Sequence, residues 1–110
     1  MSLYDYQKAK FGAEMTRDAA TFTGSFQTLG TFTDTPVKVI IQNDTTVTVT
    51  LSDDGGTTSG LSLVTGIRLV LDMQSSKVPS DWWSFRKGQT MSVSGAAGTG
   101  LFKISYLYAT

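Results

Sequence analysis

The chain has 110 residues, of which 40% are hydrophobic and 16% charged, and nine basic and nine acidic residues give a formal net charge of zero. This length accommodates one domain with one hydrophobic core, and the composition is apolar enough for that core to form. Cysteine and histidine are absent, which excludes disulfides, thiol chemistry and histidine as a general base or metal ligand.

The first twenty residues differ from the rest and predict an N-terminal arm. Gly12 interrupts a stretch of helix-tolerant residues, and the apolar spacing is too sparse for a helical stripe. We expect residues 1–20 to be partly helical or extended and to order against other chains; a terminus without fixed structure is the alternative. The candidate interface residues of this arm are Tyr4, Tyr6, Phe11 and Met15.

From Thr21 onward the hydrophobic period is two, which predicts strands. Residues 22–27 alternate large and small side chains, and residues 37–42 place three aliphatic side chains on one face. Residues 46–51 alternate threonine with Val47, Val49 and Leu51 and form the clearest strand pattern.

Turn chemistry separates the later strands. Asn43-Asp44-Thr45 and the run from Ser52 to Gly56 are turn sequences, and residues 57–62 are expected to form a loop. Alternation resumes over Ile67–Asp72 and is followed by an irregular segment, residues 73–88. Two strands, Thr90–Ser94 and Leu101–Tyr108, close the chain, and the glycine-rich residues 95–100 join them.

This succession of about six to eight short strands predicts an all-β fold, an antiparallel β-sandwich of jelly-roll type or a small barrel. An α/β fold is disfavoured because no helical segment separates consecutive strands. We expect an N-terminal arm over residues 1–20 and one β-sandwich domain over residues 21–110.

No motif predicts catalysis, a cofactor site or a metal site. Turn geometry already explains the aspartates at positions 44, 53 and 54, and the spacing of a calcium loop is missing. No serine lies in a nucleophile motif, and the glycine-rich residues 95–100 lack the lysine of a phosphate-binding loop. We therefore expect a protein without enzymatic activity that binds no cofactor.

The charge distribution and hydropathy also limit the partners. The densest basic spots are Lys8/Lys10 and Arg86-Lys87, too small for the basic stripe of a nucleic-acid-binding protein. The N-terminus lacks the apolar core of a signal peptide, and no segment is long and apolar enough to span a membrane. We expect synthesis in a cytoplasm without export, with neither nucleic acid nor membrane as a partner.

Trp82 and Trp83 are the most distinctive side chains of the irregular segment. Neighbouring residues point in different directions, so one indole is expected to pack on the core. The other is a candidate for an interface with a partner protein, where tryptophan is enriched, or for a carbohydrate-binding surface. Burial of both under a loop is the alternative.

Several segments, taken together, resemble small structural proteins of tailed bacteriophages. They are residues 21–30, residues 36–45, Val47-Thr48-Val49 with Ser52-Asp53-Asp54-Gly55, Leu69–Asp72, Arg86–Gln89 and residues 95–100 leading into Tyr106–Ala109. The resemblance spans roughly residues 20–110, and the tryptophan pair is not part of it. It implies a β-sandwich that sits in a symmetric virion particle, without catalytic residues.

On this resemblance the expected function is a capsid decoration subunit, located in the virion and contacting the major capsid protein or other virion proteins. A neck, tail or baseplate component is the alternative within the same class, and a carbohydrate-binding module that uses Trp82 and Trp83 is the alternative from another class. Small cores without disulfides or metals often gain stability by oligomerising. A homo-oligomer is therefore expected, and the decoration role that the resemblance implies favours a trimer.

Overall fold

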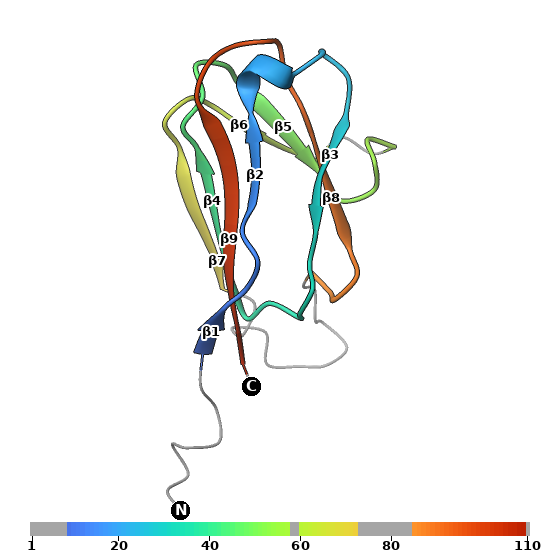
Figure 1. The fold of residues 1–110 in the computed structure, drawn as a ribbon, viewed down its shortest axis with the longest axis vertical. Helices are drawn as coiled ribbons and strands as arrows, with labels where there is room; N and C mark the ends of the chain where they lie inside the picture. The colour runs from blue at the N-terminus through green and yellow to red at the C-terminus, as the bar shows by residue number, and fades with distance from the viewer. Residues whose placement is uncertain (1–8, 58–59, 73–84, 110) are drawn as a thin grey trace, which may run out of the picture.

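The computed structural model describes residues 9–57, 60–72 and 85–109, which form a sandwich of two antiparallel sheets (Figure 1). Sheet A contains β1 (Ala9–Phe11), β2 (Met15–Asp18), β4 (Lys38–Asn43), β7 (Arg68–Asp72) and β9 (Leu101–Ala109). Sheet B contains β3 (Gln27–Thr31), β5 (Val49–Ser52), β6 (Leu61–Leu63) and β8 (Thr90–Ser94). The prediction of an all-β antiparallel sandwich is confirmed.

The strand order is that of a jelly roll. Sheet A runs β2-β9-β4-β7, and sheet B runs β3-β8-β5-β6. β1 and β2 follow each other along the same edge of β9 and pair with different parts of it. The pairs β5–β6, β4–β7, β3–β8 and β2–β9 are nested antiparallel hairpins. A long hairpin folded over in this way gives the two four-stranded faces of a jelly roll.

Alternation of side chains explains why these segments form a sandwich. In β4, Val39 and Ile41 are fully buried while the residues between them are partly exposed. In β9, Phe102, Ile104 and Tyr106 are buried in the same way. Each strand therefore turns every second side chain into the space between the sheets. The remaining buried hydrophobic residues are Met15, Ala19, Phe22, Phe32, Val49, Leu51, Leu63, Met91 and Val93.

The predicted turn after β4 is built around a buried polar network. The Asn43 side chain has no exposed surface, and its Nδ2 donates to the carbonyl groups of Val47 (3.0 Å) and Leu63 (2.8 Å). Its Oδ1 accepts from the backbone N–H (3.1 Å) and the hydroxyl (2.6 Å) of Thr45. Asn43 thus links the turn that follows β4 to the end of β6.

The N-terminal arm predicted over residues 1–20 differs from the structure where the structure describes it. β1 and β2 pair with β9 as strands of sheet A, and Ala19 lies in the core. These residues lack a helical stripe because they form strands. A short strand needs only alternate side chains in the core, and Met15 supplies one from β2. Residues 9–20 therefore belong to the sandwich, and residues 1–8 lie outside the described residues.

Two predicted boundaries were also wrong. The strand expected over residues 22–27 begins only at Gln27, because the chain first makes a 3₁₀ turn at Ala19–Thr21 and then bends at Gly24, whose φ is +84°. The loop expected over residues 57–62 ends in the short strand β6, which pairs with β5. In both places pairing with a neighbouring strand decides where the strand begins, and the local sequence pattern does not show this pairing.

Candidate interaction surface

The outward face of sheet A carries a continuous row of apolar side chains. Phe11 pairs with Leu107 across β1 and β9, and Ile40 pairs with Val70 across β4 and β7. Leu107 pairs with Lys38, two residues from Ile40 on β4, so Leu107 and Ile40 are diagonal neighbours on one face. We call Phe11, Leu107, Ile40 and Val70 the sheet A stripe, which crosses four strands.

The stripe faces away from the core. Phe11 is 80% exposed and Val70 is 56% exposed, while Ile40 and Leu107 are half-buried. Their immediate neighbours in sequence, such as Ile41 and Tyr106, point inward and are buried. An aromatic ring and three aliphatic side chains are therefore held at the surface by strands whose other faces form the core.

Charged side chains of both signs border the stripe. Lys38 and Asp72, a cross-strand pair, flank Leu107 and Val70 on one side. On the other side, Glu14 accepts a hydrogen bond from the Ser105 hydroxyl (3.2 Å), and Lys103 lies one outward position further along β9. An apolar centre with a charged rim is the usual composition of a protein–protein interface.

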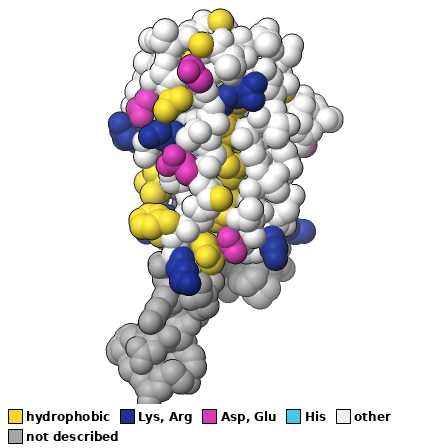
Figure 2. All heavy atoms as spheres, in the orientation of Figure 1, with side chains coloured by type: hydrophobic (Ala, Val, Ile, Leu, Met, Phe, Trp, Pro, Cys, Tyr) yellow, Lys and Arg dark blue, Asp and Glu magenta, His cyan; other side chains and the backbone are white. Residues whose placement is uncertain are grey.

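The space-filling view is consistent with this arrangement. Figure 2 shows hydrophobic side chains at the surface on the left of the molecule, the side on which Figure 1 places β4, β7 and β9. Acidic and basic side chains lie close together on the same side (Figure 2). The surface therefore has mixed charge around its apolar centre.

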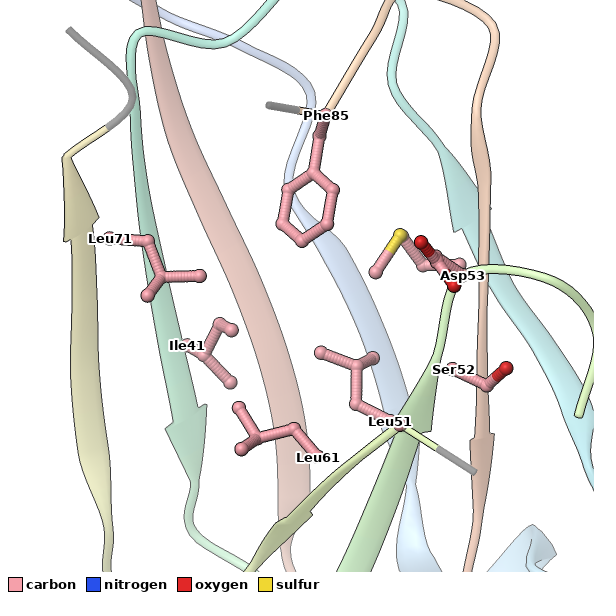
Figure 3. Close-up of a pocket in the computed structure, with 9 residues that line it drawn as sticks. Ile41, Leu51, Ser52, Asp53, Leu61, Leu71 and Phe85 are labelled. Carbon is pink, nitrogen blue, oxygen red and sulfur yellow. The ribbon is translucent and has the colours of Figure 1, made fainter. Parts of the chain in front are cut away.

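A second feature is an apolar cleft of about 260 Å³ between the two sheets. Figure 3 shows Ile41 and Leu71 of sheet A facing Leu51 and Leu61 of sheet B, with Phe85 at one end. The rest of the lining is Ser52, Asp53, Gly60 and Met91. β6 and β7, which contribute Leu61 and Leu71, are edge strands of their sheets, so the cleft lies along the side of the sandwich where these two edges face each other.

The polar residues at this cleft support the turn after β5. The Ser52 hydroxyl donates to Asp54 Oδ1 (2.7 Å) and accepts from the backbone N–H groups of Asp54 (3.2 Å) and Gly56 (3.0 Å). Asp53 accepts from Gln89 Nε2 at 3.4 Å. The predicted role of Asp53 and Asp54 as turn residues is confirmed, and the cleft offers mainly apolar contact.

The predicted interface residues have different outcomes. Phe11 is exposed and lies at one end of the sheet A stripe. Met15 as an interface residue was wrong: it is 4% exposed and packs in the core, because its position on β2 faces sheet B. Tyr4, Tyr6, Trp82 and Trp83 lie outside the described residues.

Two further aspartates lie at the surface of the described residues. Asp44, in the turn after β4, forms an exposed ion pair with Arg68 at 3.3 Å, a contact that contributes little to stability. Asp72 lies on the outward face of β7, and Asp81 lies outside the described residues. Over the ranges 9–57, 60–72 and 85–109, no three acidic side chains gather in a group that could hold a metal ion.

Ile40, Val70 and Leu107 were not predicted as surface residues from the sequence. Each is the middle residue of three consecutive apolar residues within a strand: Val39-Ile40-Ile41, Leu69-Val70-Leu71 and Tyr106-Leu107-Tyr108. Three apolar residues in a row place two side chains on one face of the sheet and the middle one on the opposite face. That break in alternation was visible in the sequence and marks an apolar outward face.

The chain matches no protein-family model, and neither a curated protein nor a solved structure matches it. Within the described residues, no helix has the length and apolar character needed to cross a membrane.

Proposed function

We propose that this protein is a non-enzymatic structural subunit of a tailed-bacteriophage virion, and that it decorates the capsid by contact with other virion proteins. The observation that carries the proposal is the sheet A stripe. An exposed phenylalanine beside three aliphatic residues, with charges at the border, is suited to contact with protein.

Two further features support the virion assignment. The jelly roll occurs in viral capsid proteins, although it also occurs in lectins and cupins. A fold hosts many functions, so it narrows the proposal only together with other observations. The second feature is the resemblance of residues 20–110 to small virion proteins of tailed phages, which is carried by turns and strand ends.

The absence of histidine and cysteine supports a structural role over an enzymatic one. Without these residues, acid–base chemistry would depend on carboxylates. Among the carboxylates that the structure describes, Asp18 accepts from the Ala20 N–H at the 3₁₀ turn, Asp44 pairs with Arg68, and Glu14 binds Ser105. Each thus has a structural contact of its own.

The proposal is tested on purified tailed particles from cells that produce the chain. Mass spectrometry is expected to find the protein in the particles at many copies, and cryo-electron microscopy is expected to place it over the icosahedral shell. Copies at a single vertex would instead identify a neck, tail or baseplate component. Particles that lack the protein altogether would contradict a virion function.

A pair of matched variants then tests the role of the stripe. Val70→Thr replaces a methyl group by a hydroxyl and keeps the branched shape that suits a strand. Val64→Thr makes the same change at a residue that is 58% exposed, close to the 56% of Val70, but lies between β6 and β7 outside the stripe. We expect lower occupancy on particles for Val70→Thr and unchanged occupancy for Val64→Thr.

A further inference from the structure

We propose that the sheet A stripe joins two copies of this chain face to face, sheet A against sheet A, around a two-fold axis. This inference rests on the proposed function and specifies it: the virion protein that the stripe contacts is a neighbouring copy of the same subunit on the particle. The occupant is a second copy of this chain. The charges that border the stripe match those of a second copy.

A half-turn about the long axis of the stripe superposes the stripe on itself and exchanges its two borders. Lys38, on one border, then faces the border that carries Glu14 and Ser105 in the other copy. Asp72, also on the first border, faces the part of the second border that includes Lys103. Both pairings bring opposite charges together. Each pairing occurs twice in the dimer, because a two-fold axis repeats every contact between two residues.

The alternative half-turn, about an axis across the stripe, does not have this property. It leaves each border opposite itself, so Lys38 would face Lys38 of the other copy. Like charges in contact oppose association. The arrangement of charges therefore selects one orientation of the two copies.

The charge of the whole chain does not oppose self-association. Nine basic and nine acidic residues cancel, so two copies approach without long-range repulsion. The chemistry of the stripe also suits a second copy, because an aromatic ring at one end and a β-branched residue at the other can pack against the same pair in the partner.

The contact is small. A stable interface buries about 800 Å² on each partner, whereas the stripe consists of four side chains, two of them already half-buried. We therefore expect a weak dimer, with a dissociation constant of roughly 10 µM to 1 mM. Contacts of this strength become effective when many copies are held on one particle.

The test is the mass of the purified full chain in solution, measured by sedimentation velocity from roughly 1 µM, below the expected dissociation constant, to roughly 1 mM. The mass is expected to rise from that of one chain, 11.8 kDa, toward twice that value. Val64→Thr is expected to behave like the wild type. The variant Phe11→Thr/Val70→Thr is expected to remain monomeric throughout, and circular dichroism checks that it is folded.

Charge reversal tests the orientation. Lys38→Glu and Glu14→Lys each place like charges opposite each other twice in a dimer of identical chains, so each variant is expected to associate at least tenfold more weakly than the wild type. An equimolar mixture of the two variants restores opposite charges at both contacts, and we expect association close to that of the wild type. A mixture as weak as either variant alone would overturn the proposed orientation.

Other results would overturn the inference without touching the proposed function. A chain that stays monomeric to 1 mM, forms a trimer, or dimerises equally well with the Phe11→Thr/Val70→Thr change does not use the stripe for a two-fold contact; its presence on particles would still support the virion function. A dimer that depends on the stripe, formed by a protein absent from particles, would support the inference and contradict the function.

Discussion

The ring of Tyr106 packs directly against the backbone of Gly12, where it fills the space that a side chain at position 12 would need. The Gly12 N–H donates to the Tyr106 carbonyl at 2.9 Å, so the same two residues are also joined through the backbone. Gly12 lies between β1 and β2, and its missing side chain lets Tyr106 reach the loop after β3. There the Tyr106 hydroxyl is 2.8 Å from the hydroxyl of Thr33.

Gly12→Ala is expected to lower the free energy of unfolding by roughly 1–3 kcal/mol, because the added methyl group overlaps the Tyr106 ring and must displace it. Urea denaturation measures the change. Ala13→Ser, at the exposed neighbouring position, is the control and is expected to change the stability by less than about 0.5 kcal/mol.

A double-mutant cycle checks that the cause is this contact. In a Tyr106→Ala background the ring is gone, so Gly12→Ala is expected to cost little. An equal cost in both backgrounds would contradict a clash with the ring.

Tyr106→Phe keeps the ring and removes the hydroxyl, which accepts from the Thr33 N–H (3.2 Å) and contacts the Thr33 hydroxyl. We expect a loss of about 1 kcal/mol of unfolding free energy, the usual value for a hydrogen bond in a partly buried setting. Tyr108→Phe is the matched control, since its ring packs beside that of Tyr106 and no bond of its hydroxyl is seen within residues 9–57, 60–72 and 85–109. Equal effects of the two changes would argue against the Thr33 contact.

Asn43→Ala is expected to be among the most destabilising polar substitutions, at roughly 2–4 kcal/mol, because it leaves buried partners of the network unpaired. The carbonyl groups of Val47 and Leu63 would lose their donor, and the Thr45 N–H would lose its acceptor. Thermal and urea unfolding measure the loss. Thr48→Ala, at an exposed position of the same connection, is expected to be close to neutral.

Met15 and Phe11 provide a contrast between core and surface on neighbouring strands. Met15→Ala is expected to lower the unfolding free energy by roughly 2–4 kcal/mol because it opens a cavity between the sheets. Phe11→Ala removes a side chain that is 80% exposed, so we expect little change in stability. Circular dichroism melts of the two variants distinguish the roles, and a large loss for Phe11→Ala would show that its ring supports the fold.

Most of sheet A and sheet B could be predicted from local pattern, because Val49 and Leu51 alternate with polar residues and Val39 and Ile41 are aliphatic residues two positions apart. β1 and β2 could not be predicted in this way. Each is only three or four residues long, and its strand character comes from pairing with β9, which lies more than eighty residues later in the sequence. Local alternation contains no information about such a distant partner.

The candidate surface was predicted in part. Phe11 was expected at an interface as a residue of an arm, whereas it lies at the edge of a sheet beside Leu107. Ile40 and Val70 were not predicted as surface residues, because each lies in a run of apolar residues whose other members face the core. Their proximity depends on the β4–β7 register, which the sequence does not specify without the fold.

The nested pairing of the strands constrains how the chain acquires its structure. β9 pairs with β1, β2 and β4, yet a ribosome makes it after every other strand that the structure describes. Sheet A therefore lacks its central strand until translation has passed residue 109, and β1 and β2 must wait for a partner throughout synthesis. Pairings between such distant segments are slow to form. We therefore expect folding in milliseconds to seconds once β9 has left the ribosome, beginning at the innermost β5–β6 hairpin and ending with the closure of β2 on β9.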